Sequence, residues 1–275
     1  MPPKSTQRPK SLIATVKSLS KTPQLYWFLA HVLSLVNFAG SFIFGLFSPA
    51  KALSYYRYTL FFQLISYGIV IKQVHFSSSA GSRSQLLRDE NVQYFLFAFI
   101  LWLVSFKIGT LAGTPYSYII FLFFHVATYL QSHLLESLPI PITTQAAISS
   151  RITYLTTNFT QQSLYLAATS EVMMVVNILW QLPRLVINLF RDQVFAAVHV
   201  FSIVAVIVFV KLRYNENQTM KLVVQQLDAK AAGFLSNPML PPQLLVFYQT
   251  TFKQFVAKYI SPIKVPTRSV QKKTE

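Results

Sequence analysis

The chain has 275 residues, of which 53% are hydrophobic and only 12% are charged. Soluble domains carry about 25% charged residues, so a soluble fold could not bury this much apolar surface. Lysine and arginine outnumber aspartate and glutamate by 24 to 8. That excess favours contact with anionic membrane surfaces. Nucleic-acid binding is a weak alternative, because the sequence has no zinc-finger spacing and no RNA-binding aromatic motif, and no nucleic-acid partner is predicted.

Six apolar runs follow one another along the chain. The first, 25–47, has 23 residues without a charge, which corresponds to about 34 Å of helix and is enough to cross a bilayer. Short gaps after the first and third runs predict helical hairpins, and the low glycine content favours long helices. The predicted segments are 25–47, 53–71, 92–109, 116–131, 164–181 and 194–210.

The predicted fold class is therefore an all-α, polytopic helical membrane protein. It has four to six membrane segments arranged as hairpins, together with cytoplasmic amphipathic helices. The lower number applies if 164–181 and 194–210 form a shallow re-entrant unit, because Glu171 at the bilayer centre would cost about 2.5–3.5 kcal/mol. The predicted regions are a basic N-terminal segment at 1–24, a membrane domain at 25–210, amphipathic helices at 211–262 and a disordered basic tail at 263–275.

The distribution of positive charge predicts the orientation of the segments. The two terminal flanks and the second and fourth gaps contain nineteen lysines and arginines, whereas the other three gaps contain four. Cytoplasmic flanks accumulate positive charge, so both termini are expected in the cytoplasm after an even number of crossings. The sequons at Asn158 and Asn217 then lie on the cytoplasmic side and should carry no glycan.

The C-terminal region contains the clearest amphipathic pattern. Between Gln243 and Ile260, apolar residues recur at intervals of three and four, as on one face of a helix, while Lys253 and Lys258 lie off that face. We expect this face to bind membrane; packing against the membrane helices or a partner is the alternative. The predicted membrane-binding residues are Leu245, Tyr248, Phe252, Lys253, Phe255, Lys258 and Tyr259.

Two further segments show weaker amphipathic patterns, and a basic tail follows the C-terminal one. The earlier segment, 220–235, has one apolar stripe, and the N-terminal segment has a shorter one. The basic tail could bind an acidic transport receptor or serve as an address. The residues concerned are Met220, Val223, Val224, Leu227 and Ala231 in the first stripe, Leu12, Ile13, Val16 and Leu19 in the second, and Lys264, Arg268, Lys272 and Lys273 in the tail.

Catalytic and metal-binding patterns are missing from the sequence. There is no cysteine, no GxSxG motif and no histidine pair at metal-ligand spacing. We therefore predict no enzyme activity, no metal site and no cofactor. Intramembrane His125 is expected to be a packing residue. Glu171 is the most unusual polar residue, with Arg57, Lys107 or His125 as its possible partner, and it leaves a proton-coupled transporter or channel as the alternative function. A lipid-modifying enzyme is the third class considered.

Several stretches of the membrane region resemble the Pom33/transmembrane protein 33 family, and its fungal branch in particular. The most telling positions are His125, Thr128, Tyr129, Glu171, Arg213 and Tyr214, and the matching stretches are 54–71, 89–102, 119–129, 168–179 and 212–227. The resemblance implies a non-enzymatic protein of the endoplasmic reticulum and nuclear envelope that contributes to nuclear pore complex assembly or distribution and to membrane shaping. It also implies nucleoporins, a karyopherin and reticulon-type proteins as partners, and a C-terminal amphipathic helix that binds curved anionic membrane.

Overall fold

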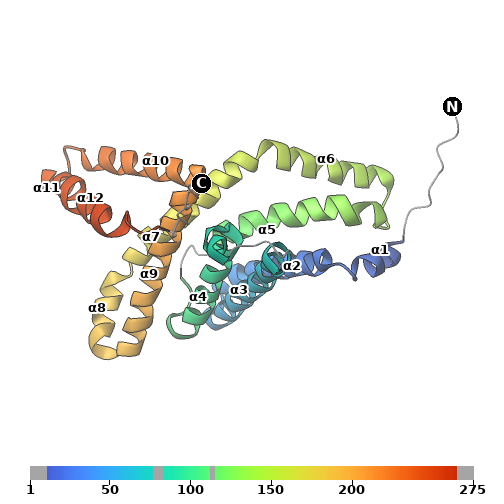
Figure 1. The fold of residues 1–275 in the computed structure, drawn as a ribbon, viewed down its shortest axis with the longest axis horizontal. Coiled ribbons are helices and arrows are strands. Elements are labelled where there is room, and N and C mark those ends of the chain that lie inside the picture. Colours follow the sequence, from blue (N-terminus) through green and yellow to red (C-terminus); the bar gives the residue numbers. More distant parts are fainter. Residues whose placement is uncertain (1–10, 77–82, 112–114, 265–275) are drawn as a thin grey trace, which may run out of the picture. The chain divides into compact units, whose positions relative to one another are not determined.

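The computed structural model describes residues 11–76, 83–111 and 115–264, and all regular structure in these ranges is helical (Figure 1). The predicted all-α class is confirmed. Five helical segments of the described residues are long and apolar enough to cross a bilayer, which agrees with the expected four to six. They are Pro23–Gly45, Glu90–Ile108, Tyr116–Ser137, Thr160–Leu179 and Gln193–Glu216.

The chain forms two compact units. The first contains the described residues up to Ile69 together with Tyr118–Ser163, and the second contains Val70–Ser117 together with the described residues from Leu164 onward. The boundaries between the two units fall inside helices, after Ile69, Ser117 and Ser163.

In the first unit, α2 (Pro23–Gly45) and α3 (Pro49–Ile71) form the predicted hairpin. The Ser34 hydroxyl donates to the carbonyl of Thr59 over 3.1 Å, which links the two helices. Close packing explains Gly40, because a Cβ atom there would lie 2.7 Å from the ring of Tyr55. Helix α3 is as long as α2 but is not among the five apolar segments, since it is richer in tyrosine and other polar residues.

The rest of the first unit surrounds the C-terminal end of α5. Helix α5 (Tyr116–Tyr129) continues through a wider turn, Leu130–Leu134, and is followed by α6 (Ile142–Asn158). The Gln131 amide donates to the hydroxyls of Ser149 and Thr153, at 2.8 and 2.9 Å, and so joins α6 to this turn. The sequence predicted only a gap between two apolar runs here. The short α1 (Leu12–Leu19) forms at the expected N-terminal amphipathic segment.

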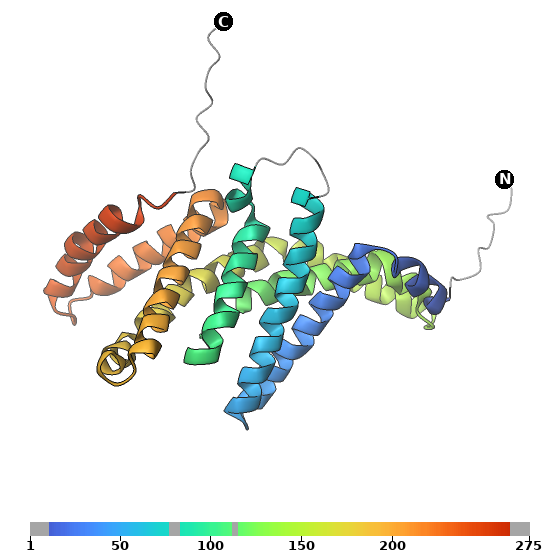
Figure 2. The ribbon, with the colours of Figure 1, turned by 60° about the horizontal axis from the view of Figure 1, so that its bottom comes forward.

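The second unit is built on an antiparallel pair, α4 (Glu90–Ile108) and α9 (Gln193–Glu216), which lie side by side in Figure 2. The rings of Phe97 and Phe209 stack at 4.1 Å between them. The side chain of Asp89 caps α4 and that of Asp192 caps α9, each accepting a backbone N–H. Gly109 ends α4 with a φ of 81°, a conformation that favours glycine.

The remaining helices of this unit surround that pair. Helix α7 (Thr160–Leu179) leads through a two-residue turn to α8 (Leu182–Arg191), which lies along α9 (Figure 1). After α9, the side chain of Asn217 caps α10 (Gln218–Leu235). Four short elements then run without a gap from Pro242 to Ile260: α11 (Pro242–Phe247), a wider turn (Tyr248–Phe252), α12 (Lys253–Phe255) and a second wider turn (Val256–Ile260). We call residues 242–260 the C-terminal segment.

Candidate membrane-binding and interhelical sites

The C-terminal segment folds back along α10 (Figure 1). The two are fastened at Asp228 of α10, whose carboxylate accepts a hydrogen bond from the Tyr248 hydroxyl over 2.6 Å. The Lys253 ammonium lies 2.9 Å from the same carboxylate. These three residues form the Asp228 clamp. Two of the predicted membrane-binding residues, Tyr248 and Lys253, are thus occupied by a contact within the protein.

The clamp changes the ionisation of both acidic members. The hydrogen bond from Tyr248 and the nearby Lys253 ammonium hold the pKa of Asp228 below its ordinary value. Burial, together with the Asp228 carboxylate, raises the pKa of Tyr248 to about 12. At neutral pH the clamp therefore contains a charged carboxylate and a neutral hydroxyl, which is the state that allows Tyr248 to donate its proton.

Beyond the clamp, the same segment leaves aromatic side chains uncovered. Phe252, Phe255 and Tyr259 are 40%, 52% and 57% exposed, respectively. The rings of Phe255 and Tyr259 lie 5.0 Å apart, and the Lys258 ammonium lies 5.2 Å from the Tyr259 ring centroid. Leu245, also predicted to bind membrane, is half-buried. The exposed part of the predicted face is therefore its C-terminal half, an aromatic surface flanked by lysine.

Helix α10 uses its apolar stripe differently. Met220 and Val223 have no exposed surface, and Val224, Leu227 and Ala231 are partly buried. The Tyr165 hydroxyl of α7 donates to the Gln226 side chain over 2.6 Å, which holds α10 against the rest of the unit. For α10, then, packing against the membrane helices accounts for the stripe.

The basic tail lies mostly outside the described residues. Lys264 is the last described residue, and Arg268, Lys272 and Lys273 fall beyond it. The carbonyl of Ile263, just before the tail, accepts a hydrogen bond from the side chain of Asn215 near the end of α9. The tail thus starts beside the C-terminal end of an apolar helix, and its partner binding remains a prediction.

Glu171 is 1% exposed and belongs to a buried polar network of the second unit. Its carboxylate accepts a hydrogen bond from the Tyr94 hydroxyl and lies 3.4 Å from the Nε atom of Arg213. Arg213 also forms an ion pair with Glu90, with 2.7 Å between Nη1 and Oε1. The suggested partners Arg57, Lys107 and His125 were wrong, because Arg213 is the cation beside Glu171 and Lys107 pairs with Asp192.

His125 lies in an aromatic cluster of the first unit. Its ring is 5.2 Å from that of Trp27 and 5.5 Å from that of His31, and the His31 Nδ1 atom lies 2.9 Å from the backbone carbonyl of Trp27. Nearby, Phe28 and Tyr129 stack at 4.6 Å. The cluster joins α2 to α5. Among the described residues, no group of three metal-ligating side chains comes together here or elsewhere.

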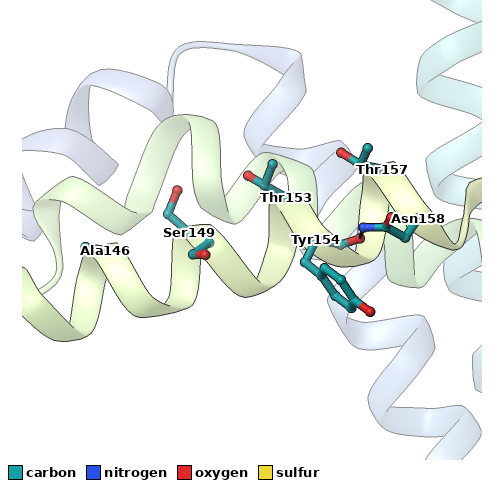
Figure 3. A pocket seen from close by; sticks show the side chains of 7 residues that line it. Ala146, Ser149, Thr153, Tyr154, Thr157 and Asn158 are labelled. Carbon is teal, nitrogen blue, oxygen red and sulfur yellow. Dashed lines mark hydrogen bonds between the residues drawn. The ribbon is translucent and has the colours of Figure 1, made fainter.

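A hollow of about 630 Å³ lies along α6 in the first unit (Figure 3). Hydroxyl groups dominate its lining, and the labelled side chains all project from one helix. The lining contains no carboxylate, histidine or cation that could act as an acid, base or electrophile. The residues are Ala146, Ser149, Ser150, Thr153, Tyr154, Thr157 and Asn158.

Two roles found in the structure were not predicted from the sequence. Arg213 stood out only through the family resemblance, although an arginine in the last turn of an apolar helix is itself a signal that a buried acid needs a partner. No sequence pattern singled out Asp228. Its spacing from the aromatic segment could not reveal the clamp, because the turn that brings Tyr248 back to it is not encoded in helical periodicity.

Five apolar helices, a buried ionic network between them and amphipathic helices beyond the last one define a multi-pass membrane protein. The chain belongs to the transmembrane protein 33/nucleoporin POM33 family, whose model matches residues 5–262. The predicted family is therefore confirmed.

Curated relatives match nearly the whole chain. The "pore and endoplasmic reticulum protein of 33 kDa" of Saccharomyces cerevisiae is 32% identical, over 86% of this chain and 90% of the relative. "Nucleoporin POM33" of Chaetomium thermophilum is 26% identical, over 98% and 99%. "Tetra-spanning protein 1" of Schizosaccharomyces pombe is 25% identical, over 92% and 90%. No solved structure matches the chain significantly.

Proposed function

We propose that this chain is a non-enzymatic membrane-organising protein of the endoplasmic reticulum and nuclear envelope. It contributes to nuclear pore complex assembly or distribution and to membrane shaping, and its C-terminal segment binds curved anionic membrane. The names of the fungal relatives, one a pore and endoplasmic reticulum protein and another a nucleoporin, support the location. The observation that carries the membrane-binding part is the exposed aromatic surface of Phe252, Phe255 and Tyr259 beside Lys258.

This surface has the chemistry of a membrane interface. Aromatic rings are favoured at the boundary between headgroups and acyl chains, and lysines beside them are attracted to anionic lipids. The segment also stays near the bilayer, because α10 holds it and α10 follows directly after α9. A helix that inserts into one leaflet takes up area there and so favours curvature.

The proposed topology places both termini in the cytoplasm after an even number of crossings. The charge asymmetry of the gaps supports it, and α3, with the length of a full span, supplies the sixth segment. On this topology the basic tail, with Lys264 at its start, faces the cytoplasm. There it can meet a karyopherin or nucleoporins, while reticulon-type proteins share the same membrane.

The test of membrane binding uses the full chain reconstituted in liposomes. In the wild type, amide hydrogens of residues 242–260 should exchange about fivefold more slowly when about a third of the lipid is anionic than with zwitterionic lipid alone. Phe252→Asp with Phe255→Asp should abolish this difference, because a charged group is costly below the headgroups.

The matched control adds the same two charges on the other side of the segment. Gln249→Asp with Gln254→Asp changes exposed polar residues and should leave most of the protection in place. If both double variants lose protection equally, charge alone explains the effect and the aromatic surface is not the binding site.

Glu171 separates this function from the alternative of a proton-coupled carrier. If the network is structural, the side chain in Glu171→Gln still accepts a hydrogen bond from Tyr94, and Arg213 still forms its ion pair with Glu90. The free energy of unfolding should fall by about 1–3 kcal/mol, and localisation should not change. Normal stability and localisation with complete loss of a cellular function would instead favour the carrier.

A further inference from the structure

Two ion pairs mark the ends of the antiparallel α4–α9 pair. Glu90 pairs with Arg213 at one end over 2.7 Å, and Lys107 pairs with Asp192 at the other over 2.8 Å. At 1.5 Å per residue, the distance between the two levels is about 26 Å along α4 and about 32 Å along α9. This is the thickness of the hydrocarbon core. The two ion pairs therefore lie at the two faces of the membrane.

Helix α8 lies inside the layer that these ion pairs define. Asp192 alone separates α8 from α9, and α8 packs back along the first half of α9 (Figure 1). Leu185 is buried in this contact, and the Arg184 guanidinium lies 5.0 Å from the Phe195 ring centroid. From Arg191 to Leu182, α8 thus extends from the Asp192 level to about half the depth of the membrane.

The first part of α7 lies outside this layer. Glu171 contacts Arg213 and so marks the opposite membrane face. Tyr165, earlier in α7, binds Gln226 of α10, which is beyond the end of α9. The segment that crosses the layer is then 171–191, about 30 Å of helix, although hydropathy favours Thr160–Leu179. Its break at Trp180–Gln181 falls near the middle of the membrane.

Helix α8 is also two-sided. Gln181, Arg184, Asn188 and Arg191 recur at intervals of three and four and form one polar stripe. On the other side, exposed apolar residues gather. No carboxylate of the described residues lies within ion-pair distance of either guanidinium. The exposed apolar residues of α8 are Leu182, Val186, Ile187, Leu189 and Phe190, of which Ile187 borders the polar stripe.

We propose that α8 is embedded in the leaflet opposite to the one that faces the C-terminal segment, with its apolar side among acyl chains and Arg184 and Arg191 bound to phospholipid phosphates. Guanidinium groups bind phosphate oxygens in a bidentate manner. Arg184 starts about 12 Å from the Asp192 level. Its side chain bends toward Phe195, near that level, as expected of an arginine that reaches for the interface.

The depth of α8 can be measured because the chain has no cysteine. Full-length variants with one cysteine each, Val186→Cys and Leu166→Cys, would carry an environment-sensitive fluorophore in liposomes that contain nitroxide-labelled acyl chains. Both positions are exposed, at 55% and 59%. We expect at least twofold stronger quenching at 186 than at 166. Stronger quenching at 166 would show that Thr160–Leu179 is the span and would overturn the proposal.

The contact with phosphate is tested by changing the charge of the lipid and of the two arginine side chains. In nanodiscs of full-length protein, replacing part of the zwitterionic lipid with phosphatidylserine should raise the melting temperature, and Arg184→Gln with Arg191→Gln should remove more than half of that rise. Lys221→Gln with Lys230→Gln removes two charges from α10 and should keep most of it.

A conservative variant guards against misfolding. Arg184→Lys with Arg191→Lys retains both charges but not the bidentate geometry, and should recover part of the rise in melting temperature. An equal rise in the wild type and the glutamine variant would show that Arg184 and Arg191 do not bind anionic headgroups and would overturn this part of the proposal. These outcomes are independent of the C-terminal segment, whose aromatic residues stay unchanged throughout.

Discussion

Helix α10 and the C-terminal segment both show an apolar stripe beside lysines, yet they use it in opposite ways. In α10 the stripe is covered, and Met220 and Val223 have no exposed surface. In the C-terminal segment Phe255 and Tyr259 remain more than half exposed. Helix α10 follows α9 directly and packs against α9 and α7, whereas the segment is fastened to α10 at Asp228 and reaches α9 with its last turn. An amphipathic pattern thus predicts that the apolar side of a helix makes a contact. The connection to neighbouring helices determines whether that contact is with protein or with the membrane.

The difference between the two regions is tested most directly by truncating one apolar side chain in each. Met220→Ala should lower the free energy of unfolding by about 2–5 kcal/mol, because it leaves a cavity in a packed site. Phe247→Ala, at a residue that is 57% exposed, should change it by less than about 0.5 kcal/mol. Unfolding in mixed detergent micelles measures both. A large effect of Phe247→Ala would mean that the segment is packed like α10.

A smaller effect is expected at the clamp that joins the two regions. Asp228→Asn keeps the shape of the side chain but removes its charge, so Lys253 loses its ion pair and Tyr248 a charged acceptor. Partly exposed pairs of this kind contribute about 1 kcal/mol or less. Amide exchange of residues 242–260 should therefore quicken a few-fold, with α4 and α9 unchanged. Glu216→Gln, which removes an acidic charge at the end of α9 without touching the clamp, should have no such effect.

The sequence could predict the long helices but not the pairing of their polar residues. The run 92–109 forms α4 at Glu90–Ile108 and the run 194–210 lies within α9, because an uninterrupted apolar stretch leaves the backbone in lipid no alternative to helix. Which cation meets Glu171 depends instead on how α4, α7 and α9 pack. Arg213 lies 42 residues away from it, and no local pattern connects the two.

Helices α6 and α8 were not predicted, for different physical reasons. Helix α6 is rich in serine and threonine, which favour helices weakly, and its apolar residues are too few for a clear period. Helix α8 is only 10 residues long and was counted as a gap between two spans because of Arg184 and Arg191. For the predicted membrane-binding face, periodicity could not show that Tyr248 and Lys253 turn toward Asp228.

The smallest expected effect is the pH response of the clamp. The pKa of Tyr248 is raised from 10.0 to about 12, so the folded state favours its neutral form. The resulting stabilisation is complete below about pH 10 and is lost as the pH rises toward 12. Asp228 has a lowered pKa, so its contribution is lost only as the pH falls below its ordinary value of 3.8.

Membrane association of the C-terminal segment should therefore not vary between about pH 5 and 9. The difference in tyrosinate absorbance between the wild type and Tyr248→Phe should show a titration near pH 12. Asp228→Asn should shift this titration part of the way back toward 10, since burial, the larger cause of the raised pKa, remains. If Tyr248 titrates at its ordinary value in the wild type, the segment does not fold back onto α10, and its whole apolar face would be free to enter the membrane.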